Sequence, residues 1–304
     1  MRNQYIDKFI RHCKYHKGLN DKTIKAYIID LSQYRIFSGG KIEKNALTTF
    51  IEHLHKSYKP KTVKRKIAVL KVFVNYLYFE DIIEHNPFLK IKTSFKLPLI
   101  LPKTIPLNEI STILGCAYAQ LGYAGTEYLR KMVTRDIAIL ELLFATGARV
   151  SEVCSLKVEN INLNDRYIKI YGKGSKERLI QIENKDVIKA LSNYENAFFN
   201  LMDATGYFFI NRINKRISEQ SVRFMIKKYS KMANCNKNVT PHMFRHSFAT
   251  LLLEEDVDIR YIQKLLGHSS ITTTQIYTHV STAKQREILA AKHPRNKLMI
   301  IPRV

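Results

Sequence analysis

The chain has 304 residues, of which 45% are hydrophobic and 11% aromatic, and its formal net charge is +24. This length favours two domains, and the apolar content excludes a disordered tail. So large a positive charge destabilises a compact protein by self-repulsion unless a polyanion binds it, so we expect a nucleic-acid partner. A ribosome-binding or membrane-binding protein would carry a similar charge, and motifs must decide between these classes.

The cysteine and hydropathy patterns indicate where the protein works. The four cysteines form no CxxC pair, and no secretory signal precedes them. This usage is typical of a reduced protein whose thiols are ordinary packing residues. The longest apolar stretch, residues 137–148, is too short to span a membrane and contains Glu141. We therefore expect a cytoplasmic protein with no membrane partner.

Residues 1–92 are predicted to form a helical domain. Asn20 is a suitable N-cap for one helix, and another begins near Pro60, since apolar residues return at helical spacing after each. The opposite face of the second helix carries three basic residues, Lys61, Lys64 and Arg65. This face is interpreted either as a solvated surface or as a contact to DNA, and the sequence leaves both open.

Residues 93–106 are predicted to be a basic, extended linker, and residues 107–304 to be a second domain. Pro98, Pro102 and Pro106 interrupt any helix in the linker. A linker of this kind would let two domains bind opposite faces of a duplex.

The second domain is predicted to be mainly α-helical with a small β-sheet. Residues 136–146 have a helical pattern, whereas residues 167–171 and 179–182 predict a β-hairpin around the turn Gly172-Lys173-Gly174. Further helices are predicted from Asp186, from Ser218, from Pro241 after a Thr240 N-cap, and from near Asp256 to Gly267. A short helix from Ser269 or Ser270 would hold Tyr277, and residues 282–292 would form the last one.

Two arginines in this domain are candidates for phosphate binding. Arg149 follows the break at Gly147, and a helix would place Glu152 on its face to orient it. A guanidinium there can bind a phosphate with two hydrogen bonds, although a surface salt bridge is the plainer interpretation. His242 and Arg245 share a face at a helix start, where amides and the helix dipole attract anions.

Lysines and a tyrosine complete the candidate chemistry. Lys173 in the hairpin turn could protonate a leaving oxygen, although a solvent-exposed turn lysine is the plainer interpretation. Lys176 and Arg178 are interpreted as contacts to the DNA backbone. Tyr277 lies nine residues after His268. A phenol, with its usual pKa of about 10, attacks phosphorus well only where cationic groups stabilise the transition state.

Five segments carry a family resemblance: ATGARVSE at 145–152, GKGSKER at 172–178, HMFRHSFAT at 242–250, LLGH at 265–268 and YTHV at 277–280. In this order they resemble the tyrosine recombinase family, which includes phage integrases and Xer-type recombinases. The resemblance covers residues 107–283 by motif, and the first domain by its architecture as a helical core-binding domain. Met243 stands where leucine is common. Residues 115–133 are longer than the same region of compact family members, and Gly122 and Gly125 indicate a loop there.

The resemblance implies site-specific DNA recombination, as in chromosome-dimer resolution or mobile-element integration and excision. The implied catalytic residues are Arg149, Lys173, His242, Arg245, His268 and Tyr277. The arginines and histidines would bind the scissile phosphate, and Lys173 would be the general acid toward the leaving 5′-hydroxyl. Tyr277 would attack the phosphate and form a covalent 3′-phosphotyrosine.

The same resemblance implies double-stranded DNA core sites as substrate, with a dimer on each site and a tetramer in synapsis. It leaves room for an accessory or activating protein. The tail at Leu298–Ile301 would dock on a neighbouring subunit, with packing on its own domain as the alternative.

No carboxylate cluster or Cys/His ligand spacing surrounds these motifs, so we expect no metal, no other cofactor and activity in excess EDTA. Two other functions stay open: a type IB topoisomerase-like enzyme, which shares the chemistry, and a DNA-binding accessory protein. The intact six-residue set argues against the accessory protein.

Overall fold

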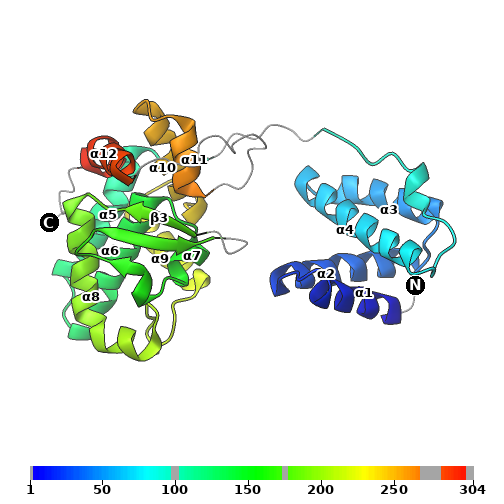
Figure 1. The fold of residues 1–304 in the computed structure, drawn as a ribbon, viewed down its shortest axis with the longest axis horizontal. Helices are drawn as coiled ribbons and strands as arrows, with labels where there is room; N and C mark the ends of the chain where they lie inside the picture. The colour runs from blue at the N-terminus through cyan, green and yellow to red at the C-terminus, as the bar shows by residue number, and fades with distance from the viewer. Residues whose placement is uncertain (1–2, 97–102, 173–176, 268–281, 299–304) are drawn as a thin grey trace. The chain divides into compact units, whose positions relative to one another are not determined.

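The computed structural model describes residues 3–96, 103–172, 177–267 and 282–298 (Figure 1). The chain divides into two compact units, residues 1–100 and 101–304, each with its own hydrophobic core. The division falls inside the segment that the sequence predicts as a linker. No helix in the described ranges combines the length and the apolar content that crossing a membrane requires.

The first unit is an arrangement of helices. Its elements are α1 (Asn3–Tyr15), α2 (Asp21–Ser38), α3 (Lys44–Ser57), α4 (Pro60–Phe79) and the 3₁₀ turn η1 (Pro87–Lys90). As predicted, Asn20 caps α2 by accepting a hydrogen bond from the backbone of Thr23, and α4 begins at Pro60. Phe9, Leu31 and Phe73 are fully buried where the helices meet.

The basic face of α4 is exposed at Lys61, Lys64 and Arg65, whereas the next residue, Lys66, is buried. Lys66 donates a hydrogen bond of 2.8 Å to Asp30 of α2, whose carboxylate also pairs with Arg65. A buried charge is stable only when it is paired, so Asp30 ties α2 to α4. Arg65 is therefore paired with a carboxylate of its own unit, whereas Lys61 and Lys64 project from the surface of the unit.

The second unit is mainly helical with one small sheet, as predicted. Its helices are α5 (Leu107–Gly122), α6 (Glu127–Thr146), α7 (Val150–Cys154), α8 (Lys185–Thr205), α9 (Glu219–Met232), α10 (Pro241–Glu254), α11 (Ile259–Leu266) and α12 (Thr282–Lys292). The 3₁₀ turns are η2 (Val158–Asn160) and η3 (Pro294–Lys297).

The sheet contains β1 (Ile161–Asn162), β2 (Tyr167–Tyr171) and β3 (Glu177–Gln181) in the order β1-β2-β3, with antiparallel pairing. The predicted hairpin is therefore confirmed, with Ile168 opposite Ile180, while β1 was not predicted. Residues 173–176 of the hairpin turn lie outside the described residues.

The loop expected around Gly122 and Gly125 is present but short, and the rest of residues 115–133 is helical. Helix α5 continues to Gly122 and α6 begins at Glu127, so only residues 123–126 connect them. Both helices contribute buried apolar residues to one core, among them Leu114 and Val133, which explains why the range is helical. Gly122 is the last residue of α5, and Gly125 lies in the connection.

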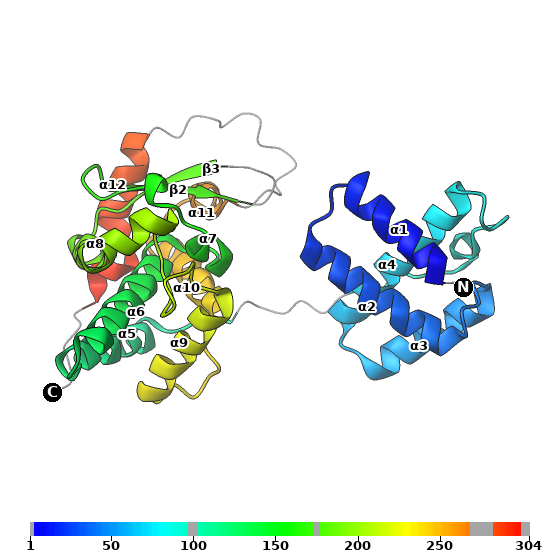
Figure 2. The ribbon, with the colours of Figure 1, turned by 90° about the horizontal axis from the view of Figure 1, so that it is seen from below.

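Helix α6 is the centre of the second unit, packing against α5, α8 and α10 (Figures 1 and 2). Its last two turns are buried on every side, with Leu140, Leu143 and Phe144 fully enclosed. Gly147 ends the helix with a φ of +58°, in the left-handed region that favours glycine. This turn brings Arg149 to the start of α7.

The chain after α12 returns to α6. Arg295 donates two hydrogen bonds, of 2.8 and 2.9 Å, to the fully buried carboxylate of Glu141, and His293 contacts the carbonyl of Ala145 at 2.7 Å. Leu298 is also buried within this unit. The first residue of the predicted tail thus packs on its own unit. Residues 299–304 lie outside the described residues, so their docking on a neighbouring subunit stays a prediction.

Candidate active site

Arg149 and Glu152 form one corner of the candidate site. Arg149 directly precedes α7, and Glu152 is the third residue of that helix. The Glu152 carboxylate accepts hydrogen bonds of 2.8 Å from both the backbone N–H and the Nη1 of Arg149. The prediction that Glu152 orients Arg149 is therefore confirmed as a contact. The backbone bond also satisfies an N–H group at the helix start.

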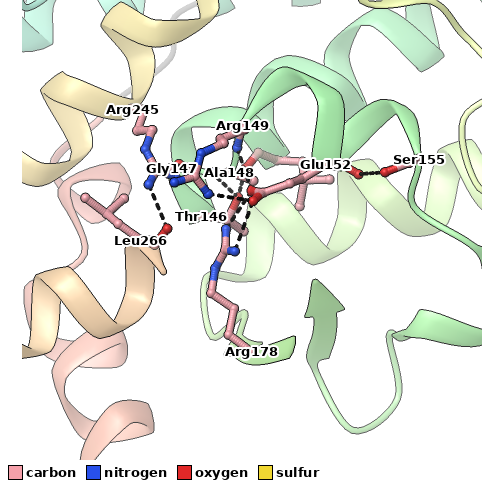
Figure 3. Close-up of polar contacts among 10 residues, drawn as sticks. Thr146, Gly147, Ala148, Arg149, Glu152, Ser155, Arg178, Arg245 and Leu266 are labelled. Carbon is pink, nitrogen blue, oxygen red and sulfur yellow. Dashed lines mark hydrogen bonds and ion pairs between the residues drawn. The ribbon is translucent and has the colours of Figure 1, made fainter. Parts of the chain in front are cut away.

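Arg178 on β3 shares the same carboxylate. Its Nη2 donates to Glu152 Oε2 at 2.7 Å and its Nη1 to Oε1 at 3.2 Å, and its side chain is 10% exposed (Figure 3). The sequence interpretation of Arg178 as a DNA-backbone contact did not foresee this carboxylate partner. A signal was present, because alternation along β3 puts Arg178 on the same face as the buried Ile180.

Arg245 reaches the site from α10 and is 5% exposed. Its guanidinium donates hydrogen bonds to the carbonyls of Gly147 at 2.8 Å and Leu266 at 2.6 Å (Figure 3). The side chain therefore joins the end of α6 to the end of α11. Burial lowers the pKa of Arg245 to about 10, and repulsion from Arg149 and Arg178 acts in the same direction. At neutral pH the group stays protonated.

We call Arg149, Glu152, Arg178 and Arg245 the arginine cluster. Burial raises the pKa of Glu152, but hydrogen bonds from Arg178 and Arg149 outweigh it and hold that pKa below its usual range. The cluster thus contains three positive charges and one negative charge. The excess positive charge, in a largely buried setting, favours binding of an anion such as a phosphate.

His242 and Arg245 come from the first turns of α10 but differ in burial. His242 is exposed, whereas Arg245 is buried. The first turns of α10 therefore lie at the edge of the site, with one of these two side chains inside it and the other at the surface. His246 is half-buried, and burial lowers its pKa with help from repulsion by His242 and Arg245. His246 was not selected from the sequence, although it lies one helical turn after His242.

Four of the predicted site residues lie outside the described residues: Lys173, Lys176, His268 and Tyr277. The chain before His268 is described and reaches the cluster. Leu266 accepts the hydrogen bond from Arg245, and a Cβ on Gly267 would lie 2.9 Å from Arg178 Nη1. Gly267 has a φ of +64°, so its backbone conformation also favours glycine.

The donor set of the described site is that of an anion site. In the described part of the chain, no group of three or more His, Cys, Asp or Glu is arranged to hold a metal ion. Arginine N–H groups bind phosphate oxygens directly and stay charged at all working pH values. The arrangement can therefore hold a phosphate and stabilise negative charge that develops on it.

Comparison with known proteins gives a consistent result. Residues 120–284 match the phage integrase family, and residues 6–81 match the phage integrase N-terminal SAM-like domain. A tyrosine recombinase from Agathobacter rectalis is 50% identical over 295 residues, covering 96% of each chain.

Two solved structures share the fold. The XerH site-specific recombinase bound to a palindromic difH substrate has a TM-score of 0.71 at 20% identity and covers 94% of this chain and 83% of its own. A lambda integrase tetramer bound to a Holliday junction has a TM-score of 0.66 at 16% identity, with coverage of 92% and 80%. At these identities the likeness concerns the fold.

Proposed function

From the premise that this chain belongs to the phage integrase family, we propose that it is a site-specific tyrosine recombinase. It would cut and rejoin double-stranded DNA at core sites, through a phosphotyrosine on Tyr277. The observation that carries the proposal is the arginine cluster, to which three segments distant in sequence each contribute a guanidinium group. Arg149 and Arg178 bind the Glu152 carboxylate, and Arg245 lies close enough for its charge to interact with theirs. We expect the reaction to take place in the cytoplasm.

Arg149 and Arg245 would bind the non-bridging oxygens of the scissile phosphate. Both guanidinium groups have fixed orientations, because Glu152 holds Arg149 and two backbone carbonyls hold Arg245. Preorganised donors stabilise the charge that develops in the transition state without the cost of reorienting solvent. His242 and His268 would contact the same phosphate and assist proton movement.

Tyr277 would supply the nucleophile. Its hydroxyl gives up its proton to His242 or His268 as its oxygen attacks phosphorus. The bond from phosphorus to the 5′-oxygen breaks, and the 5′-oxygen takes a proton from Lys173. The product is a 3′-phosphotyrosine and a free 5′-hydroxyl. The 5′-hydroxyl of a partner strand then attacks the phosphotyrosine, releases Tyr277 and restores a phosphodiester. Each step exchanges one P–O bond for another, so no outside energy source is needed.

The substrate is proposed to be a pair of duplex core sites, each bound by a dimer, with a tetramer in synapsis. The XerH and lambda integrase structures, which are recombinase–DNA complexes, support this assembly by analogy of fold. Basic residues distributed over both units would neutralise the DNA backbone. An accessory or activating protein is compatible with the proposal and is not required by it.

The test is capture of the covalent intermediate. Wild-type protein is incubated in excess EDTA with fragmented DNA of its own organism, denatured, and the fragments that remain attached are sequenced to find the site. A duplex of that site, nicked just beyond the scissile phosphate, then traps cleavage because the short 5′-hydroxyl strand diffuses away. The adduct is measured with wild type, Tyr277→Phe and the exposed-tyrosine control Tyr123→Phe.

We expect a denaturant-stable adduct with wild type and Tyr123→Phe, and none with Tyr277→Phe. An adduct that persists in Tyr277→Phe would mean that another residue attacks. DNA binding with no adduct from any protein would favour a DNA-binding accessory protein. Relaxation of supercoiled DNA that lacks the captured site would favour a topoisomerase-like enzyme.

A further inference from the structure

Arg178 has an unusual environment for a residue that the proposed reaction does not use. Its side chain is nine-tenths buried, and both terminal nitrogens are directed to Glu152. Its Nε is buried and has no hydrogen-bond partner among the described residues. The backbone of Gly267 runs so close that a Cβ there would contact the guanidinium. Burial of this kind is costly for a cation, so the position calls for a specific role.

Arg149 and Arg178 share the carboxylate of Glu152, and this sharing indicates the role of Arg178. Oε1 accepts from Arg149 Nη1 and Arg178 Nη1, and Oε2 accepts from the Arg149 backbone and Arg178 Nη2. Without Arg178, the whole negative charge of the carboxylate would act on Arg149. A phosphate entering the site would then compete with Glu152 for the Arg149 guanidinium, and the net charge of the cluster would fall by one.

We propose that Arg178 is a positioning residue for strand cleavage, which neutralises Glu152 so that the charges of Arg149 and Arg245 remain available to the scissile phosphate. The inference rests on the proposed function for its reaction, but its electrostatic basis applies to any phosphate bound at the cluster. It replaces the interpretation of Arg178 as a contact to the DNA backbone.

A purely structural role for Arg178, joining β3 to α7, predicts a different response to charge. If Arg178 acts by neutralising Glu152, removing both charges together should restore the site, because Arg149 and Arg245 again face no competing carboxylate. If Arg178 only holds the two elements together, the double variant should be at least as damaged as the single variant.

The two roles also differ in their response to pH. In the part of the chain that the structure describes, the charged groups that face Glu152 are Arg149 at the start of α7, Arg178 from β3 and Arg245 from α10. Burial raises the pKa of Glu152, and hydrogen bonds from Arg178 and Arg149 lower it. When Arg178 is lost, fewer hydrogen bonds oppose the effect of burial. Glu152 in Arg178→Met therefore takes up a proton at a higher pH than in wild type. That proton removes the competing charge, so acidification should partly rescue this variant.

The first measurement uses inorganic phosphate and needs no DNA. Thermal unfolding of the full chain is followed against phosphate concentration, at ionic strength matched with chloride, for Arg178→Met, Arg178→Lys and Arg178→Met/Glu152→Gln. The control is Arg166→Met, which removes an exposed arginine paired with Glu183 just before β2. We expect phosphate affinity to fall about tenfold in Arg178→Met, a change of about 1.4 kcal/mol. It should return to within about threefold in the double variant and stay unchanged in the control.

The second measurement is the rate of adduct formation on the nicked site between pH 6 and pH 8.5. At high pH and saturating DNA, Arg178→Met should be about 100-fold slower than wild type, and the ratio of the two rates should narrow as pH falls. Arg178→Lys keeps the positive charge, so its rate should lie between those of wild type and Arg178→Met. This variant replaces Arg178→Met in the experiment if the methionine variant does not fold.

A double variant no better than Arg178→Met would overturn the inference. If wild type forms no adduct, the proposed function fails. The phosphate titration would still decide whether Arg178 neutralises Glu152.

Discussion

A buried neutral imidazole makes the second unit sensitive to mild acid. His293 Nε2 lies 2.7 Å from the Ala145 carbonyl, which can only accept, and Nδ1 accepts the Arg295 backbone N–H at 2.9 Å. Burial lowers the pKa of His293 to about 4. In the unfolded chain a histidine titrates near 6.5, so between these values only the unfolded state takes up the proton. Stability is therefore lost as pH falls from about 6.5 to about 4, by about 3 kcal/mol in all.

We expect His293→Gln to remove most of this pH dependence. Glutamine can keep a hydrogen bond to Ala145 but does not titrate, so the variant should be less stable at pH 7.5 and lose less on acidification. Thermal unfolding at pH 7.5 and pH 5 measures the difference, with His16→Gln as the control, because His16 is exposed and lies directly after α1. Parallel losses in His293→Gln and wild type would mean that other groups cause the acid sensitivity.

At the scale of elements, the turn between α6 and α7 sets the geometry of the arginine cluster. Gly147 adopts a φ of +58° and accepts a hydrogen bond from Arg245. A Cβ at this position would lie 2.6 Å from a ring carbon of Phe248 and 2.9 Å from a methyl group of Leu266. Phe248 is fully buried, so it has little room to move.

Gly147→Ala is therefore expected to lower the free energy of unfolding by about 3 kcal/mol or more and to abolish adduct formation. Gly206→Ala is the matched control. Gly206 also has a left-handed φ, of +66°, but the atom nearest to its added Cβ is Lys157 Nζ at 3.8 Å. Only the backbone strain, about 1 kcal/mol, should appear there. Urea unfolding of the full chain checks both values, and equal losses would show that steric contact at Gly147 is unimportant.

Local patterns were sufficient to predict most elements but not the partners of buried charges. The Asn20 cap, the Pro60 helix start and the β2–β3 hairpin each follow from chemistry within a few residues. The burial of Arg178 could also have been inferred, from its alternation with Ile180. Its partner could not, because Glu152 lies 26 residues away and belongs to another element.

The same limit applies to Glu141, whose carboxylate suggested only that the apolar run at 137–148 does not cross a membrane. Its partner Arg295 is 154 residues away in sequence. No periodicity connects such positions, so only the tertiary fold identifies the pair. The predicted roles of Lys173, His268 and Tyr277 rest on the family resemblance, and stay predictions.

At the scale of the whole molecule, the charge of +24 should dominate the salt dependence of DNA binding. Lys61 and Lys64 project from α4, whereas the neighbouring Lys66 is buried against Asp30. If Lys61 and Lys64 bind phosphates, changing either lysine to methionine should make the plot of log DNA-binding constant against log salt concentration less steep, by about 1 in slope. Lys44→Met on α3 is the control for loss of charge alone.

Binding titrations at four or more salt concentrations measure these slopes. Equal changes for Lys61→Met and Lys44→Met would indicate a general charge effect rather than a contact. Arg65 is less informative, because its pairing with Asp30 mixes binding with stability. For Lys66→Met we expect lost stability, by about 3–5 kcal/mol, since Asp30 would keep a buried charge with one partner fewer.

The pairing of Glu141 with Arg295 has a consequence for how the protein is made. Helix α6 leaves the ribosome long before Arg295, and until then its buried carboxylate has no arginine partner. The first unit has a separate core and can fold during synthesis. A nascent chain would therefore acquire its N-terminal unit well before a finished active site. Translation itself would thus delay the ability to cut DNA. To test this, a chain that ends at Lys292 is treated with a protease, which should cut the second unit and leave the first unit intact.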